Sequence, residues 1–293
     1  ACRRFRLEPG DAAAAVSLRR AAVGKRDVLL LAAALDRAVC RAAAPWIAAP
    51  TLVKIDLRTC GLDGAGLASL ARQLADNDVL TSLDVSGNDF RDGVRLARGA
   101  PANAGLAALG AALAGNRGLT SLNLSESRVE ARGAAAIADG LRLNAALTDL
   151  RLSHNAICDV TPQGWGEFET AGVESVARML ACNQTLERLD LAHNQLCGVT
   201  APWNVGARGR FSARALAALA PALRQNTRLC EVNLTDNGAL EAGARPLVDD
   251  VARGRGRGGA GFELHERLGN GKRRYCILRR PPQKGGPQRT APP

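Results

Sequence analysis

Apolar residues recur along the chain with one fixed spacing, in which leucine or a similar residue occupies the first, fourth, sixth and eleventh positions of a segment. Six segments follow it, beginning at residues 52, 80, 119, 147, 186 and 229. The fourth, LTDLRLSHNAI (147–157), carries Leu150 and Leu152 inside the pattern and a polar Asn155 at the ninth position. Alternation of polar and apolar residues from the third to the sixth position predicts a short β-strand with one buried face.

A second pattern lies in phase with the first. In five copies an asparagine stands three residues before the opening position, and a small residue stands eleven residues before that asparagine. The asparagines are Asn77, Asn116, Asn144, Asn183 and Asn226, and the small residues are Gly66, Gly105, Gly133, Gly172 and Ala215. Apolar residues between them follow helical spacing, as at Leu67, Leu70 and Leu74. Each unit is therefore predicted to be a strand, a loop, an amphipathic helix and an asparagine-containing return turn.

One strand and one helix cannot bury their apolar faces alone, so the units are expected to stack. The strands would form a parallel inner sheet, and the helices would form an outer layer with a continuous core between the two. The asparagine at the ninth position is expected to hydrogen-bond the backbone where the chain leaves the sheet. It is present as Asn88, Asn155, Asn194 and Asn237, and is replaced by Cys60 and Ser127 in two copies.

These residues resemble the leucine-rich repeat, and the full helices resemble its ribonuclease-inhibitor-type subfamily. The resemblance covers roughly residues 13–250 and implies an α/β solenoid, or horseshoe, that binds proteins. The units also resemble those of NOD-like receptors and Ran GTPase-activating proteins, so regulation of a GTPase is an alternative. The chain departs from these relatives because its units alternate between short and long and its C-terminal segment is basic rather than acidic.

Three regions are expected along the chain. Residues 1–51 form an N-terminal capping repeat, in which AAAVSLRRAAV (13–23) matches the strand pattern and 27–44 forms the helix. Residues 52–251 contain the six repeats. Residues 252–293 are an Arg/Gly/Pro-rich tail, in which 261–280 could form a hairpin.

Composition places the charge at the ends of the chain. The protein has 293 residues, is 46% hydrophobic but only 3% aromatic, and has a formal net charge of +11. The net charge is +9 over 252–293 and +5 over 1–51, whereas 52–251 is slightly acidic. The tail is therefore either a solubilising extension or a weak contact for RNA, an acidic protein or an anionic membrane. No apolar run approaches the length of a membrane span.

The eight cysteines include no C-x-x-C motif and are too sparse for a disulfide scaffold. We expect buried free thiols in a reducing, cytoplasmic location. Cys158 and Cys197 stand at equivalent positions of adjacent repeats, four residues after His154 and His193. Two buried side chains are the first interpretation of this pair, and a disulfide or a zinc site is the alternative.

Candidate binding residues lie in two places. The outward-facing strand positions and strand exits predict a concave surface of mixed charge, which suits a protein better than a phosphate backbone. Its residues are Lys54, Asp56, Arg58, Asp84, Asp149, Arg151, His154, Arg188, Asp190, His193 and Glu231. The long units insert extra residues after the strand, and two insertions carry Trp165, Phe168, Trp203 and Phe211. These rings either form an aromatic ledge for a partner or pack on the solenoid itself.

We find no catalytic motif, so the sequence predicts a non-catalytic scaffold without a cofactor or a metal, whose partner is a protein.

Overall fold

The computed structural model describes residues 14–17, 52–91, 103–161, 166–198, 212–237, 262–269 and 272–279. Five helices alternate with strands in this part of the chain: α3 (Gly64–Leu74), α4 (Ala104–Gly115), α5 (Ala131–Leu141), α6 (Ala171–Cys182) and α7 (Arg214–Gln225). The strands are β1 (Ala14–Ser17), β2 (Leu52–Asp56), β3 (Ser82–Asp84), β4 (Ser121–Asn123), β5 (Asp149–Arg151), β6 (Arg188–Asp190), β7 (Glu231–Asn233), β8 (Phe262–Gly269) and β9 (Lys272–Arg279). The helix expected over 27–44 lies outside the described residues.

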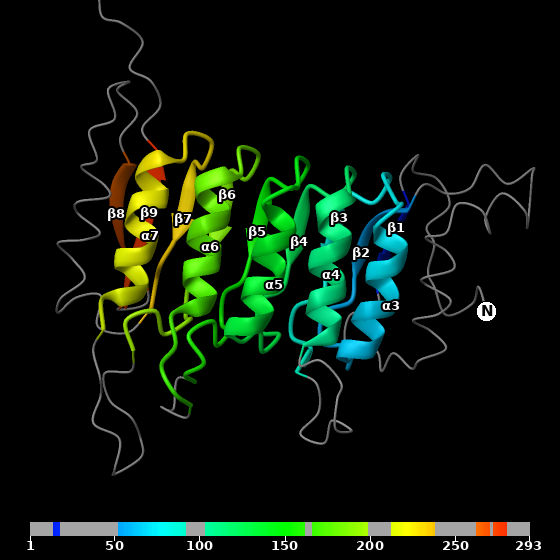
Figure 1. Cartoon of the computed structure of the whole chain (residues 1–293), viewed down its shortest axis with the longest axis horizontal. Helices are drawn as coiled ribbons and strands as arrows, with labels where there is room; N and C mark the ends of the chain where they lie inside the picture. The colour runs from blue at the N-terminus through cyan, green and yellow to red at the C-terminus, as the bar shows by residue number, and fades with distance from the viewer. Residues whose placement is uncertain are drawn as a thin grey trace, which may run out of the picture.

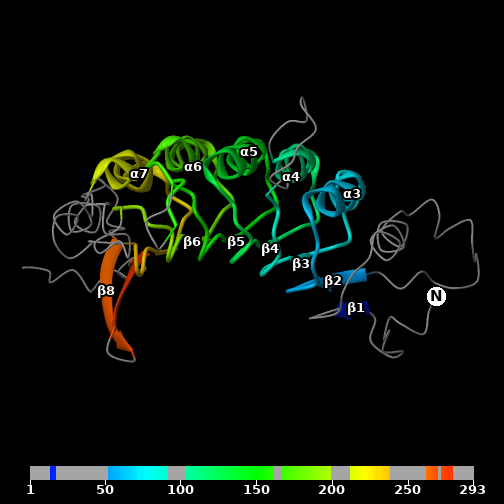
Figure 2. The ribbon, with the colours of Figure 1, turned by 90° about the horizontal axis from the view of Figure 1, so that it is seen from below.

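The strands from β1 to β7 pair in chain order and in parallel, and they form one sheet that continues through β9 to β8. The helices from α3 to α7 form a single layer beside this sheet (Figure 1). The slab is curved, with the helices on the convex side and the strands on the concave side (Figure 2). The predicted leucine-rich-repeat solenoid of inner parallel strands and outer helices is therefore confirmed.

Equivalent apolar residues form columns along the slab. Leu150 pairs with Leu122 on one side and with Leu189 on the other, and Leu189 pairs with Val232. All four side chains are at most 1% exposed and belong to one continuous hydrophobic cluster. The period of two places them against the helices, so the intervening strand residues face the opposite, concave side.

The ninth-position asparagines join each repeat to the one before it. The Asn155 side-chain Oδ1 accepts the backbone N–H groups of Ser127 and Val129, at 3.0 Å each. Its Nδ2 donates to the carbonyls of Leu124 and Leu152. Asn88 and Asn237 make the equivalent bonds, which confirms the backbone role predicted for this position.

The return-turn asparagines form a second ladder at the other edge of the slab. Asn144 Oδ1 accepts the N–H groups of Ala146 and Leu147, at 2.9 and 2.8 Å, while Nδ2 donates to the carbonyls of Leu113 and Asn116. Asn116, Asn183 and Asn226 repeat this arrangement one unit apart. Two rows of buried amides thus set the distance between successive repeats along the solenoid.

The segment after residue 252 contributes to the same sheet. β8 and β9 pair antiparallel from Phe262↔Arg279 to Gly269↔Lys272, and β9 pairs antiparallel with β7, where Ile277 lies opposite Val232. At the other end of the sheet, β1 pairs in parallel with β2, where Val16 lies opposite Ile55. The hairpin extends beyond β7 on the side of the sheet opposite the helices (Figure 2).

Candidate functional site: the concave face

Two columns of side chains cover the concave face. In strand order from β2 to β7, the third repeat position gives Lys54, Ser82, Ser121, Asp149, Arg188 and Glu231. The fifth position gives Asp56, Asp84, Asn123, Arg151, Asp190 and Asn233. The sheet therefore brings together all eight strand residues that the sequence suggested for the third and fifth positions and, two positions after Asp56, Arg58.

Most side chains of the fifth position also stabilise the backbone. Asp84 Oδ1 accepts the N–H of Ser86 at 3.0 Å, and Asp190 Oδ1 accepts that of Ala192 at 3.0 Å. Asp56, Asn123 and Asn233 make the same bond to the residue two positions later. These Asx turns end the strands, so the acidic residues of this column have a structural role that the sequence analysis missed. The signal was present, because Asp or Asn occupies this position in five of the six copies.

Arg58, near the N-terminal end of the face, pairs with Asp56 through two hydrogen bonds. Its Nε and Nη2 donate to the two carboxylate oxygens of Asp56, at 2.9 and 2.6 Å, and its Nε lies 3.5 Å from Asp84 Oδ2. The hydrogen bond to Asp56 raises the pKa of the Arg58 guanidinium. This bidentate pair neutralises the charge of this part of the face.

A second charged cluster, on β5 and β6, is arranged differently. Asp149 is a carboxylate whose side chain is only 10% exposed. Arg151 Nε donates to its Oδ1 at 3.3 Å, and Arg188 Nε donates to its Oδ2 at 3.0 Å. Both arginine side chains remain about half exposed, at 54% and 50%. The bond to Asp149 raises the pKa of Arg188, and Glu187 and Glu231 add to this effect.

Between these two charged clusters, β3 and β4 present small hydroxyl and amide groups. The residues are Ser82, Ser121 and Asn123, and the half-buried Ser125 follows β4. Ser125 accepts a hydrogen bond from Ser153 in the next repeat at 3.0 Å, so the row is internally connected. A partner on this face would thus meet a neutral polar stripe flanked by charged groups.

The eighth repeat position forms a rim beside the concave face. It adopts a left-handed backbone in all six copies, with φ of 55° at both His154 and His193. The imidazole rings of these two residues stack, with centroids 3.8 Å apart, and His193 Nε2 lies 3.2 Å from Asp236 Oδ2. Glu126 precedes His154 in the same row, and the sequence analysis named neither Glu126 nor Asp236.

A comparison with protein families agrees with the repeat pattern. A family profile described as "Leucine Rich repeat" matches residues 76–93, 115–138 and 182–196. Each matched segment runs from a return turn through the following strand, which is the part of the unit that contains the leucine columns and one or both asparagine positions.

The chain is built from leucine-rich repeats. Their full helices make them repeats of the ribonuclease-inhibitor type. Among solved structures, the chain is similar to "Leiomodin-1 Actin-Binding Site 2 (ABS2)", with 26% identity over 50% of this chain and 68% of that chain, at a TM-score of 0.35. No curated protein sequence matches the chain significantly. None of the helices in the described ranges combines the length and apolarity needed to cross a membrane.

Of the four loop aromatics, one is described. Phe168 is half-buried and packs against the hydrophobic core of the leucine-rich repeats. This placement follows the alternative in which the loop rings cover the solenoid itself. Trp165, Trp203 and Phe211 lie outside the described residues.

The equivalent cysteines of adjacent repeats are buried free thiols, as expected. Burial raises the pKa of Cys158 to about 12, with a further contribution from Cys197, and burial also raises the pKa of Cys197 to about 12. His154 is exposed at the rim, whereas Cys158 is buried in the core. Within the described ranges, no group of three or more His, Cys, Asp or Glu side chains could hold a metal ion.

This burial predicts selective alkylation of the folded protein at pH 8. Cys182 and Cys230 are exposed and should react with iodoacetamide, while Cys158 and Cys197 should stay unlabelled because only a thiolate attacks. Each of the four lies on a different tryptic peptide, so mass spectrometry can quantify them separately. Denatured protein is the control, in which all four should react alike. Equal labelling in the folded state would contradict the burial.

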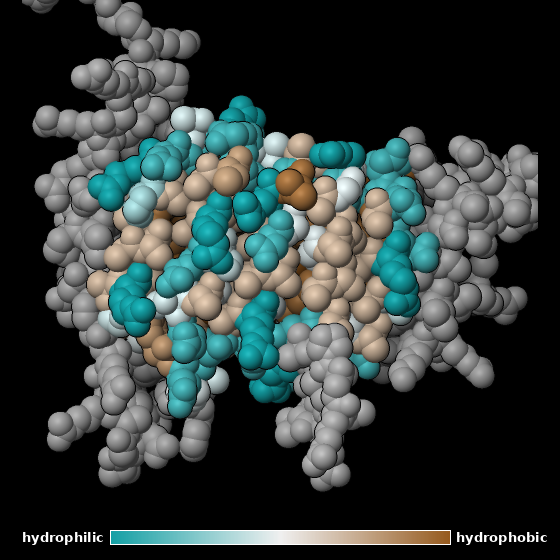
Figure 3. Space-filling view, viewed as in Figure 1, coloured by the Kyte–Doolittle hydropathy of each residue, from teal (hydrophilic) through white to brown (hydrophobic). Residues whose placement is uncertain are grey.

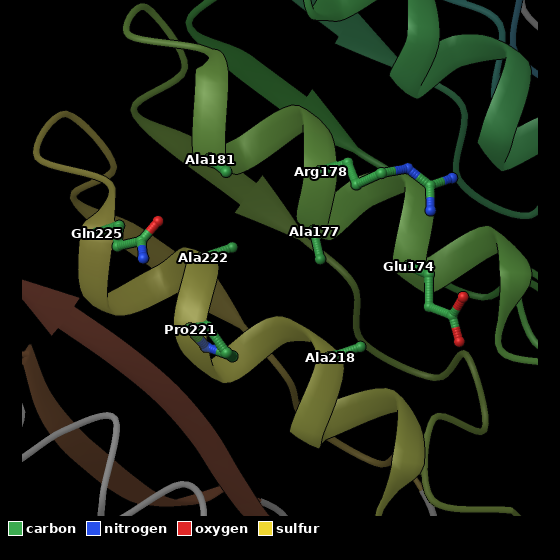
Figure 4. Close-up of a pocket in the computed structure, with 8 residues that line it drawn as sticks. All are labelled: Glu174, Ala177, Arg178, Ala181, Ala218, Pro221, Ala222 and Gln225. Carbon is green, nitrogen blue, oxygen red and sulfur yellow. The ribbon is translucent and has the colours of Figure 1, made fainter.

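The convex face of the repeats offers a shallow groove between α6 and α7. Figure 3 shows a mosaic of apolar and polar residues over these helices, and small side chains of the two helices face one another across the groove (Figure 4). The groove has a volume of about 320 Å³ and is lined by Glu174, Ala177, Arg178, Ala181, Ala218, Pro221, Ala222 and Gln225. Arg178 donates to Ser175 at 2.7 Å and Glu174 accepts from Thr170 at 2.7 Å, so each charged residue of the groove is hydrogen-bonded to a residue of α6 or of its start.

Proposed function

We propose that this protein is a non-catalytic scaffold that docks a protein partner on the concave face of its leucine-rich repeats. The proposal rests chiefly on one observation: half-exposed charged side chains of β5 to β7 stand in register on a rigid sheet. A surface that is fixed before binding loses little conformational freedom when the partner docks. Extended concave surfaces of this kind are the binding surfaces of solenoid proteins.

The charged residues of this half of the face favour a protein over a phosphate backbone. Arg151 and Arg188 alternate with Asp149, Asp190 and Glu231, so both signs lie within a few residues of each other. Opposite charges in a fixed pattern select a complementary protein surface and disfavour a ligand of uniform charge. The histidine rim and the insertions that follow β5 and β6 would extend the contact along one edge.

The proposal predicts that substitution of Arg151, Arg188 and Asp190 together will reduce partner binding by more than about tenfold. Affinity capture with the full chain, followed by quantitative mass spectrometry, would compare the wild type with this triple variant. Asp190→Asn keeps the oxygen that accepts the Ala192 N–H, and all three side chains are exposed or half-exposed, so circular dichroism should show unchanged helix content.

A charge-matched control is available on the convex side. Arg132, Asp139 and Arg142 are exposed on α5 and at its end, and they also comprise two arginines and one aspartate. Their combined substitution should leave capture unchanged. If the convex variant loses the captured proteins and the concave variant keeps them, the concave face is not the docking surface.

A further inference from the structure

Arg151 and Arg188 are positioned for more than the neutralisation of Asp149. A guanidinium carries five N–H groups, of which Nε supplies one. Each of these arginines uses Nε for Asp149, and no described residue accepts a hydrogen bond from the Nη atoms of either side chain. Asp149 therefore binds each guanidinium group through its Nε–H alone. The other four N–H groups of each arginine remain available to another acceptor.

The contrast with Arg58 shows that two arginines are not required to neutralise one aspartate. Arg58 donates both Nε and Nη2 to Asp56, and its Nε also lies 3.5 Å from Asp84 Oδ2, so that one arginine serves two carboxylates. At β5 and β6, two arginines share a single carboxylate and are half exposed. An aspartate that needed only neutralisation would be served by one bidentate arginine.

The hairpin at the end of the sheet is basic near its turn. At the turn end of the β8–β9 hairpin, Arg267 pairs with Arg274, Leu268 with Arg273 and Gly269 with Lys272. This end projects past β7 on the concave side (Figure 2). Four basic residues and no acidic residue thus occupy the three residue pairs nearest the turn of the hairpin.

We propose that the arginine pair, Arg151 and Arg188, binds a side-chain carboxylate of an acidic segment of the partner protein. The inference rests on the docking function proposed above and specifies its chemistry. The carboxylate would accept from Nη groups of both arginines, in the paired geometry that guanidinium groups favour. Asp149 is a positioning residue, because it fixes both guanidinium groups before the partner arrives and so reduces the entropy lost on binding.

Glu231 provides a sensitive test of this inference. It lies opposite Arg188 in the sheet register and contributes negative charge beside the proposed site. Its carboxylate would repel an incoming acid, so Glu231→Gln should tighten binding by a few-fold. A gain of affinity cannot arise from a variant that simply fails to fold.

The experiment selects binders from a displayed library of random peptides on the full-length protein, and then measures the affinity of the resynthesised peptides. We expect enrichment of Asp and Glu, and a loss of about tenfold or more for the Arg151→Gln/Arg188→Gln variant. Arg58→Gln is the matched control and should have little effect, because the Nε and Nη2 of Arg58 are already engaged with Asp56. Replacing the acidic residues of the peptide by Asn or Gln should cause a loss like that of the arginine variant, and the two losses should not add.

The outcomes separate this inference from the docking function. Peptides that lose affinity for Lys54→Ala and Asp190→Ala proteins but not for the arginine variant would overturn the arginine pair and leave concave docking intact. Peptides insensitive to every concave substitution, or no selected peptides at all, would contradict both. Binding of single-stranded RNA that depends on the arginine pair, without selection of acidic peptides, would overturn the inference in favour of a nucleic acid.

Discussion

Replacing Asn144 with alanine is expected to lower the free energy of unfolding by about 3–4 kcal/mol. Asn144 is 4% exposed, and its amide satisfies four backbone groups, in Ala146, Leu147, Leu113 and Asn116. Each buried group left without a partner costs about 1–3 kcal/mol, and entry of water into the vacated space reduces the sum. Urea unfolding followed by circular dichroism would measure the change.

Asn123→Ala is the matched control for this substitution. Asn123 also makes side-chain hydrogen bonds, one to the Ser125 N–H and one to Asp84, but it lies half-buried on the concave face where water can replace them. Its loss should cost no more than about 1 kcal/mol. If the two variants unfolded at the same urea concentration, the return-turn ladder would not be a main determinant of stability.

An aspartate at position 144 separates the contributions of the two halves of the amide. Asp keeps the oxygen that accepts from Ala146 and Leu147 but cannot donate to the carbonyls of Leu113 and Asn116. Its negative charge would face two carbonyl oxygens in the interior, so Asn144→Asp should be at least as destabilising as Asn144→Ala at neutral pH.

The sequence predicted the fold because its two patterns act on the same unit. The leucine spacing defines which strand residues are buried, and the phased asparagines define where each helix returns to the sheet. Together they leave one register, in which Leu150, Leu189 and Val232 lie side by side, as the structure shows. A shift of one residue would expose the whole column to water, which is why the register is strongly specified.

The details of the candidate site could not be predicted in the same way. The spacing of apolar residues placed Asp56, Asp84 and Asp190 on the concave face, but only the recurrence of Asp or Asn at the fifth position indicates that their carboxylates accept nearby backbone N–H groups. The stacking of His154 on His193 depends on a left-handed backbone at each residue. Side chains one repeat apart lie 28 to 43 residues apart in sequence, so such contacts depend on curvature and rotamers rather than on local spacing.

The different environments of Arg58 and Arg151 show the same limit of a sequence pattern. Both stand two residues after an aspartate, Asp56 and Asp149, on the same face. Asp56 belongs to the fifth position and binds its arginine bidentately, whereas Asp149 belongs to the third and is shared with Arg188 of the next strand. The shared carboxylate leaves the guanidinium groups available, and only the lateral pairing of β5 and β6 reveals this.

Adding one methyl group to α4 at Gly110 should destabilise the packing of the helix layer. A Cβ atom added at Gly110 would lie 2.1 Å from the carbonyl oxygen of Ala136 in α5, and one added at Gly140 would lie 1.9 Å from the carbonyl oxygen of Gly110. The two helices therefore approach backbone to backbone, and a clash with backbone cannot be relieved by a side-chain rotation. We expect Gly110→Ala to destabilise the protein by about 2–3 kcal/mol despite its better helix propensity.

Gly115, in the same helix, supplies the opposite expectation. A Cβ atom at this exposed residue would meet nothing within 4 Å. Gly115→Ala should therefore raise the free energy of unfolding by a few tenths of a kcal/mol to about 1 kcal/mol, because alanine loses less backbone entropy on folding. Urea unfolding of the two variants tests whether the spacing of the outer helices is set by direct backbone contact. Since that spacing fixes the curvature on which the concave face depends, a Gly110→Ala protein as stable as Gly115→Ala would contradict the close approach of α4 and α5.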